Sequence, residues 1–388
     1  MKQLLLWIIF LFVSMAAHTQ RNSASIKQNS PAIFWDSSSL REVSALNGQS
    51  ANYARMIQLT NGNLVCVYES AGGIHCTKSL DSGNTWLTPV IVAVPEDGVN
   101  MSVPDVLELK NHSLLVSYNP RPHNVGDKLD TAKHFAICTI KSDDNGATWH
   151  HKRTLYEAGY AFENGCWEPS QLQLPSGEIQ LFFSNEGIYT QSNEQNISVF
   201  RSKDNGLTWT SQPQIVSFTP GHRDGMPVPI FLKKKNEVVF SIEDNGGGQF
   251  KPSVIRNTVS QNWQKPVGAQ NKERNYTLAS PLADTVYAGA PFLRQLQSEQ
   301  TILSFQSNQD RAHNWELSCM QVAVGDSEAK HFIPVQAPFQ IPLNKHGLWN
   351  SLCILHDDTI IAITSTDAYT NATSIWMIKG KLANGKKD

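Results

Sequence analysis

The chain has 388 residues, with 32 basic against 34 acidic side chains and a formal net charge of −2. This near balance argues against a surface built to bind nucleic-acid phosphates or an anionic membrane. The apolar fraction of 40% and the charged fraction of 17% are typical of a globular protein with a substantial core. The length suits one large domain or two ordinary ones.

Residues 1–20 have the pattern of a secretory signal. Lys2 precedes an apolar run over 4–13, and small residues such as Ala16 and Ala17 follow. The apolar run is too short for a good membrane span. We therefore expect this segment to be a cleavable signal peptide, and the mature protein to be secreted or periplasmic.

The six cysteines are scattered along the chain and show no CxxC spacing, so a zinc site is not expected. Four of them lie inside apolar, strand-like runs, where buried free thiols are favoured over disulfides. These four are Cys66, Cys138, Cys319 and Cys353.

A short motif, S-x-D-x-G-x-T-W, occurs three times. The copies lie at 79–86, 142–149 and 202–209. Its Asp can accept hydrogen bonds from its own turn, its Gly takes a positive φ and its Trp packs beneath the loop. The motif resembles the Asp-box of sialidase-like propellers, in which the box is structural. We therefore assign no catalytic role to Asp81, Asp144 or Asp204.

A longer repeat covers most of the chain: apolar residues alternate with polar ones on both sides of a short polar turn, as in an antiparallel hairpin. The last Leu before each turn marks six copies, at Leu59, Leu109, Leu174, Leu232, Leu296 and Leu355. The gaps between them are 50, 65, 58, 64 and 59 residues. Units of this length fit four-stranded blades, so an all-β, six-bladed propeller is predicted over 51–388. Two β-sandwiches would not explain the even spacing. Residues 21–50 are expected to form a leader that can add a closing strand.

In a propeller, the residues just before the first strand of each blade gather around the central channel. Six positions before each repeat Leu lie Tyr53, Val103, Glu168, Met226, Ala290 and Trp349. Pro follows in four of the six copies, which supports this register because Pro is tolerated at a strand start. Glu168 is the acid of the set. Its neighbour Trp167 and partial burial would raise its pKa, which suits a general acid. The alternative is a rim carboxylate paired with an arginine.

A second carboxylate is expected at the end of the second strand of blade four. Glu243 and Asp244 are alternatives there, and strand alternation puts Ser241 and Glu243 on one face. Because blades three and four are neighbours, Glu168 and this second acid can face each other over one pocket. A solvated hairpin end is the alternative interpretation.

Further polar and aromatic side chains near the predicted rim are candidates for binding a sugar. Arg223 and Asp224 can form a pair that orients Glu243 or holds hydroxyl groups, although a structural surface ion pair is equally compatible. Trp349 can be a platform for the apolar face of a sugar, or a core residue. The candidate binding residues are Arg55, Asp105, Trp167, Arg223, Asp224, Tyr287, Trp349 and Asn350.

Six pieces, in order along the chain, resemble the exo-arabinanases of glycoside hydrolase family 93, a branch of the sialidase-like propellers. They are YARMIQL, GCWEP, RDGMPV, SIE, AGAP and WNSL. The resemblance implies release of arabinobiose-type units from the end of α-1,5-L-arabinan with retention of configuration. It implies Glu168 as acid/base and Glu243 as nucleophile. Such a pair lies about 5–5.5 Å apart. No cofactor or metal is implied, and we expect a monomer whose partner is a plant cell-wall-type polysaccharide.

Two other functions stay open. A true sialidase needs an arginine triad for the substrate carboxylate and a Tyr–Glu nucleophile pair, and Arg55 is one candidate arginine. The other arginines considered for such a triad are Arg223, Arg294 and Arg311. A non-catalytic glycan-binding propeller would keep Glu168 and Glu243 apart.

Overall fold

A computed structural model describes residues 31–44, 48–123 and 130–383. The expected signal peptide lies outside these ranges. Within them, no helix is long and apolar enough to cross a membrane.

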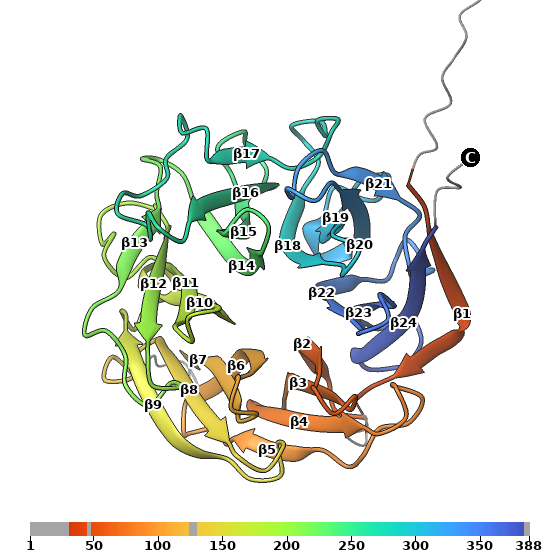
Figure 1. Cartoon of the computed structure of the whole chain (residues 1–388), viewed down its shortest axis with the longest axis horizontal. Coiled ribbons are helices and arrows are strands. Elements are labelled where there is room, and N and C mark those ends of the chain that lie inside the picture. Colours follow the sequence, from red (N-terminus) through yellow and green to blue (C-terminus); the bar gives the residue numbers. More distant parts are fainter. Residues whose placement is uncertain (1–30, 45–47, 124–129, 384–388) are drawn as a thin grey trace, which may run out of the picture. The chain divides into compact units, whose positions relative to one another are not determined.

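The described residues form six four-stranded antiparallel sheets, arranged as blades around a ring (Figure 1). This confirms the predicted six-bladed, all-β fold. Blade one holds β2 (Ala51–Gln58), β3 (Leu64–Ser70), β4 (Gly73–Ser79) and β5 (Val90–Ala93), and blade two holds β6 (Val99–Glu108), β7 (Leu114–Pro122), β8 (Ala136–Ser142) and β9 (His150–Glu157). Blade three holds β10 (Cys166–Gln173), β11 (Ile179–Asn185), β12 (Asn196–Ser202) and β13 (Gln214–Ser217), and blade four holds β14 (Asp224–Leu232), β15 (Glu237–Asp244), β16 (Lys251–Thr258) and β17 (Arg274–Tyr276). Blade five holds β18 (Ala288–Gln295), β19 (Thr301–Ser307), β20 (Cys319–Gly325) and β21 (Ile333–Val335), and blade six holds β22 (Gly347–Ile354), β23 (Ile360–Thr366), β24 (Ser374–Leu382) and β1 (Ile33–Glu42). Two short 3₁₀ helices, η1 (Phe162–Asn164) and η2 (Trp315–Leu317), precede β10 and β20.

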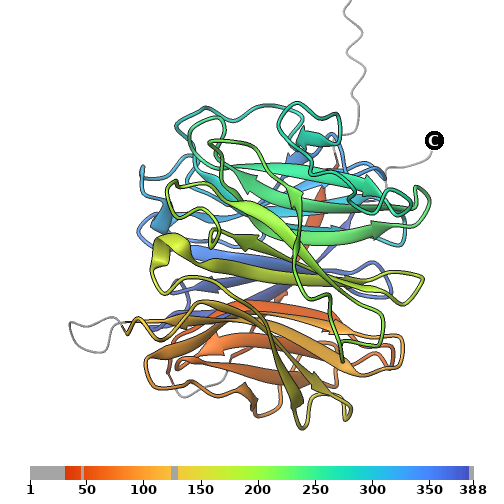
Figure 2. The ribbon, with the colours of Figure 1, turned by 90° about the vertical axis from the view of Figure 1, so that its left-hand side faces the viewer.

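The last blade contains strands from both ends of the described chain. Strand β1 pairs antiparallel with β24, so that Trp35 lies opposite Gly380. In the side view, blades one and two lie on one side of the ring and blade four lies on the other (Figure 2). By pairing with β24, strand β1 joins the beginning of the described chain to its end and completes the four-stranded sheet of blade six.

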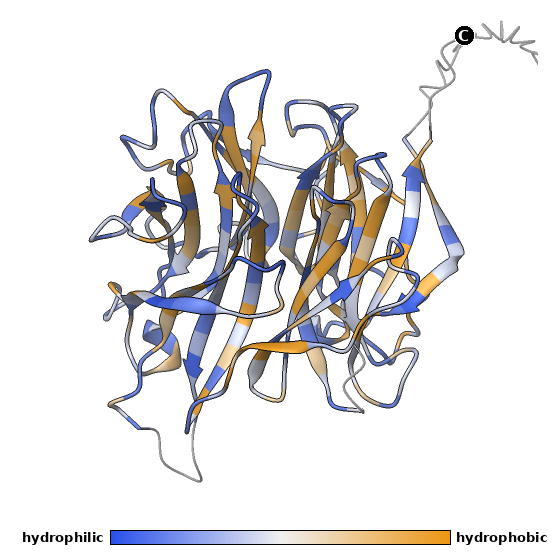
Figure 3. Ribbon diagram, turned by 60° about the horizontal axis from the view of Figure 1, so that its bottom comes forward, coloured by the Kyte–Doolittle hydropathy of each residue, from blue (hydrophilic) through white to orange (hydrophobic). Residues whose placement is uncertain are grey.

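Apolar residues concentrate in the strands and hydrophilic ones in the connections (Figure 3). The alternating pattern produces apolar layers between blades: one cluster combines Val65 and Ile74 of blade one with Val116 and Ile140 of blade two. Burying such side chains is the main favourable term in folding. All six cysteines are free, and only Cys319 is partly exposed.

The Asp-boxes connect the third and fourth strands of the first three blades. In the second box, the Asp144 carboxylate accepts hydrogen bonds from the backbone N–H of Thr148 (2.8 Å) and from its hydroxyl (2.6 Å). These bonds lower the pKa of Asp144. The box begins at Ser142, which pairs with Leu114 at the start of β7. The β-bulge in the innermost strand of this blade, between Ser102 and Asp105, instead lies opposite the later part of β7. The boxes thus lie at the opposite end of the blades from the bulges.

Each innermost strand contains one β-bulge, and its bulged residue has a positive φ. The six residues are Tyr53 (56°), Val103 (49°), Glu168 (46°), Met226 (53°), Ala290 (47°) and Trp349 (52°). They are the positions that the repeat alignment placed at the channel mouth. The members of blades one, two, four, five and six pack against one another, so they meet at the centre of the ring. We call the six residues the bulge ring, and Glu168 is its acidic member.

Candidate active site

A side chain at the end of a second strand anchors the bulge of the next blade. The backbone N–H donors and their acceptors are Tyr53 to Ser365 Oγ (3.2 Å), Val103 to Glu69 Oε2 (2.9 Å), Met226 to Ser184 Oγ (2.9 Å), Ala290 to Glu243 Oε2 (2.8 Å) and Trp349 to Gln306 Oε1 (2.9 Å). Such bonds stabilise a backbone conformation that non-glycine residues adopt at a cost. Glu243 therefore occupies a repeated structural position that brings a carboxylate to the bulge ring.

Two glycines make room for Glu243. A Cβ on Gly289 would lie 2.6 Å from Glu243 Oε2 and 2.4 Å from the Tyr287 hydroxyl, and a Cβ on Gly225 would lie 3.1 Å from Glu243 Oε1. Larger residues at either position would displace the carboxylate, which explains the Gly of RDG and of AGA. Burial raises the pKa of Glu243 to about 7; the Ala290 amide opposes this shift and the charge of Glu168 adds to it.

Glu168 projects from the bulge of blade three, with 18% of its side chain exposed. Its Oε1 lies 3.4 Å from Nη2 of Arg121, whose guanidinium lies 4.9 Å from the centre of the Trp167 ring. Burial raises the pKa of Glu168, although Arg121 and Arg223 oppose the shift. Glu168 therefore does contact an arginine, as the alternative interpretation of a rim carboxylate expected. Its pKa is nevertheless raised, because the effect of burial exceeds that of the arginines.

The two predicted acids share one electrostatic environment. The charge of Glu168 raises the pKa of Glu243, and Arg223 lowers the pKa of both. Glu168 belongs to blade three, whereas Glu243 ends the second strand of blade four and holds the bulge of blade five. Two partly exposed carboxyls with raised pKa values, supplied by different blades, can divide the roles of proton donor and nucleophile.

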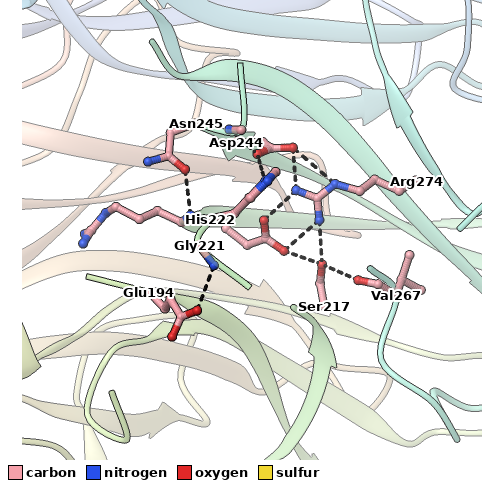
Figure 4. Close-up of polar contacts among 11 residues, drawn as sticks. Glu194, Ser217, Gly221, His222, Asp244, Asn245, Val267 and Arg274 are labelled. Carbon is pink, nitrogen blue, oxygen red and sulfur yellow. Dashed lines mark hydrogen bonds and ion pairs between the residues drawn. The ribbon is translucent and has the colours of Figure 1, made fainter. Parts of the chain in front are cut away.

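Asp244, the alternative to Glu243, is occupied elsewhere. Its Oδ1 lies 3.1 Å from Nδ1 of His222, and its Oδ2 accepts from Arg274 Nε at 3.2 Å (Figure 4). Because successive residues of a strand point to opposite faces, Asp244 faces this ion-pair cluster while Glu243 faces the bulge ring.

The expected Arg223–Asp224 pair is not seen. Asp224 is fully buried, and its two carboxylate oxygens accept from Arg274 at 2.6 and 2.9 Å. Arg223, just before β14, instead forms an ion pair with Glu186. Neighbouring residues on an extended backbone point apart, which explains the separation. Arg223 remains at the site, whereas Asp224 lies in the interior.

Three other predicted binding residues use their polar groups inside the propeller. Arg55 is buried and donates to the carbonyl of Ala54 at 3.0 Å. Asp105 accepts hydrogen bonds from the Ser170 hydroxyl at 3.0 Å and from the backbone N–H of Gln171, the next residue of β10, at 2.9 Å. Asn350 is buried and donates within its own strand. Arg55 and Asp105 lie two residues past a bulge, inside the innermost strand, which removes them from the rim.

The predicted aromatic residues lie around the two acids. Trp349 stacks on Tyr53 with ring centroids 4.6 Å apart. Tyr287 is mostly buried, and its hydroxyl accepts from Gln306 at 2.9 Å. Trp167 is mostly buried against Phe135 and Phe162, and Arg121, the ion-pair partner of Glu168, lies over its ring. Because Trp167 and Tyr287 are mostly buried and Trp349 is half-buried, these rings form the walls of the site and offer little exposed surface for stacking on a sugar.

Sequence reasoning missed several residues of the site. Arg121 and Glu186 contact Glu168 and Arg223 respectively, and burial raises the pKa of Glu186 to about 7. Arg121 is the penultimate residue of β7 and Glu186 directly follows β11, so both lie at the end of a second strand. Aligning the ends of the second strands, as was done for the starts of the first strands, would have marked them.

No protein-family profile and no curated protein matches this sequence. Similar solved structures include a protein of unknown function from Dyadobacter fermentans (TM-score 0.69, 13% identity, covering 89% of this chain and 100% of that one). The family 93 α-L-arabinofuranosidase of Fusarium graminearum, in complex with arabinobiose, has a TM-score of 0.64 at 16% identity, covering 90% and 97%. The α-L-arabinanase of Penicillium chrysogenum, also with arabinobiose, has a TM-score of 0.60 at 16% identity, covering 90% and 97%. A sialidase of Streptococcus pneumoniae has a TM-score of 0.61 at 12% identity, covering 88% and 71%. The chain therefore has the sialidase-like six-bladed propeller fold of the family 93 enzymes and the sialidases, as the sequence resemblance implied.

Proposed function

We propose that this protein is a retaining exo-glycoside hydrolase that releases arabinobiose-type units from the end of α-1,5-L-arabinan. The observation that carries the proposal is the Glu168–Glu243 pair: Glu168 is a member of the bulge ring, Glu243 accepts from the bulge residue Ala290, both carboxyls have raised pKa values, and the charge of Glu168 raises the pKa of Glu243. The substrate is proposed from the sequence resemblance and from the two similar structures that hold arabinobiose. Export is proposed from the pattern of residues 1–20.

In the proposed reaction, Glu168 protonates the oxygen of the leaving group while a Glu243 oxygen attacks the anomeric carbon. The glycosidic C–O bond breaks and a glycosyl-enzyme forms. Glu168, now ionised, then takes a proton from water, whose oxygen displaces Glu243 and restores both groups. The Ala290 N–H and Arg223 favour the ionised form of Glu243, as a nucleophile requires.

One observation favours sialidase activity as a second candidate. The Tyr287 hydroxyl and Glu243 Oε2 lie within 2.6 Å of the same point beside Gly289, as a Tyr–Glu nucleophile pair would require. However, burial raises the pKa of Tyr287, which opposes its ionisation. The arginines that a sialidase would use are also engaged: Arg55 with backbone carbonyls, Arg223 with Glu186, and Arg311 with four backbone carbonyls.

Incubation of the protein with linear arabinan, branched arabinan, arabinoxylan and a sialylated oligosaccharide, followed by chromatographic analysis of products, tests the proposal. We expect arabinobiose from linear arabinan from the first minutes onward, with little change in polymer length. Release of sialic acid would support the second candidate instead. Absence of product from every substrate would contradict both.

A positioning role for Arg274 gives a further prediction. Arg274 bridges Asp224 and Asp244, the chain neighbours of Arg223 and Glu243. Lysine cannot reproduce this forked contact, so Arg274→Lys is expected to let the strand ends shift and to lower kcat by about tenfold or more. The matched control is Arg256→Lys. Arg256 is also buried in blade four, but it donates to the backbone carbonyl of Glu328, in the β20–β21 connection of blade five.

Both lysine variants are expected to lower Tm, because each loses buried hydrogen bonds. Only Arg274→Lys is expected to lower kcat and to shift the pH profile, since only it alters the surroundings of Glu243. Equal kcat values in the two folded variants would show that Arg274 serves stability alone.

A further inference from the structure

Five aromatic rings form a continuous strip across blades four, five, six and one. Successive ring centroids are separated by 6.5 Å from Phe250 to Tyr287, 6.2 Å from Tyr287 to Trp315, 6.1 Å from Trp315 to Trp349 and 4.6 Å from Trp349 to Tyr53. We call these five residues the aromatic strip. Because it includes two members of the bulge ring, the strip extends outward from the centre of the propeller.

Exposure increases along the strip towards Trp315. Tyr53 is 3% exposed and Trp349 is half-buried, whereas Trp315 is 45% exposed. On the other side of Trp315, Tyr287 reaches the proposed nucleophile, because Tyr287 and Glu243 both lie against Gly289. The strip therefore connects an indole at the surface with the proposed catalytic carboxyl.

The backbone around Trp315 is held firmly. Trp315 begins η2, whose first turn is capped by the side chain of Asn314 accepting from the N–H of Glu316 at 2.9 Å. Arg311 donates to the carbonyl of Leu317 at 2.5 Å and also to carbonyls of the 341–345 connection that leads to blade six. Trp315 thus presents an exposed indole from a held backbone, as part of a contiguous row of aromatic rings. Contiguous exposed apolar surface, unlike a single exposed side chain, marks interaction sites.

We propose that Trp315 is a stacking platform for one sugar unit of a neutral polysaccharide. This unit lies farther along the glycan than the sugar units bound at Glu168 and Glu243. This inference rests on the proposed function and adds a determinant of chain length to it. The five side chains of the strip carry no charge, which suits a neutral glycan. The face of an indole is complementary to the C–H face of a sugar ring. Trp315 thereby strengthens the binding of long substrates and leaves bond cleavage to Glu168 and Glu243.

Replacement of Trp315 by Ala tests the platform, with kcat/KM measured on arabino-oligosaccharides of increasing length and on an aryl arabinobioside. We expect a loss of about tenfold on the long oligosaccharides, which corresponds to about 1.4 kcal/mol, and little change on the short aryl substrate. Trp315→Phe should restore most of the loss. The matched control is Phe34→Ala, which removes an aromatic side chain that is 71% exposed on the outer strand β1. Equal losses on short and long substrates, or the same loss in the control, would overturn the proposal.

Affinity electrophoresis separates this proposal from the proposed function, because it requires no catalysis. Wild type, Trp315→Ala and Phe34→Ala are run through gels containing arabinan, arabinoxylan or galactan. Retardation of the wild type and of Phe34→Ala by a neutral polysaccharide, with loss of retardation in Trp315→Ala, supports the platform even if no hydrolysis is found. Equal migration of all three proteins in every gel overturns it.

Discussion

Replacement of Glu243 by Gln is expected to lower kcat on arabinan by about 10,000-fold, because the amide cannot form the glycosyl-enzyme. The fold should persist, since the amide oxygen can still accept from the Ala290 N–H. Steady-state kinetics on arabino-oligosaccharides provide the measurement. The matched control is Glu69→Gln, because Glu69, at the end of the second strand of blade one, makes the same contact to the Val103 N–H in the bulge of blade two. We expect this control to keep most of its activity, and a comparable loss in both variants would contradict the assignment.

The stability of Glu243→Gln gives an independent check. Burial in the fold raises the pKa of Glu243 to about 7 from its ordinary value of 4.5. A raised pKa means that the folded state favours the protonated carboxyl, so the stability it contributes is present at low pH and is lost as pH rises through about 7. Glu243→Gln is therefore expected to have a higher Tm than wild type at pH 8 and a similar Tm at pH 4. An inactive variant with lower Tm at both pH values would indicate misfolding.

Replacement of Glu168 by Gln is expected to reduce hydrolysis of arabinan by about 100- to 10,000-fold, because the leaving oxygen is no longer protonated. The loss in bond cleavage should be much smaller for an activated aryl glycoside, whose leaving group needs little protonation. Comparison of pre-steady-state bursts on the two substrates measures this difference. An equal loss on both substrates would contradict the role of Glu168 as general acid.

The pH profile of the Glu168→Gln variant follows from the coupling of the two acids. The negative charge of Glu168 helps to raise the pKa of Glu243, so its removal should lower that pKa and move the acid limb of kcat/KM to lower pH. The alkaline limb, which reports loss of the proton from the acid, should disappear. An unchanged profile would show that the two carboxyls do not share a site.

The repeats made the fold and the position of Glu168 in the bulge ring predictable. Leu174 and its five equivalents defined a register, and all six residues placed at the rim by that register adopt the positive-φ bulge. Glu168 could be singled out because its equivalents are not acidic. Strand alternation placed Glu243 and Asp244 on opposite faces but left open which of them is the second acid, and the anchoring bond from Ala290 to Glu243 could not be anticipated.

The remaining contacts of the site join segments that no repeat relates. Arg274 on the outermost strand of blade four reaches Asp224 on the innermost one, 50 residues earlier. Trp315 lies in a connection specific to blade five, so neither periodicity nor register marked it. Arg55 was expected at the rim of the channel. In the structure the bulge residue Tyr53 lies there, and Arg55, two residues farther along the strand, is buried inside the propeller.

The anomeric configuration of the first product tests the central claim most directly. Wild-type protein is mixed with an arabino-oligosaccharide in D₂O, and the configuration of the newly formed reducing end is followed by ¹H NMR before mutarotation. Attack by Glu243 followed by water activated by Glu168 predicts that the α configuration is retained. Formation of the β product would mean direct attack by water between more widely spaced carboxyls, about 6.5–9.5 Å apart, and would contradict the role of Glu243 as nucleophile.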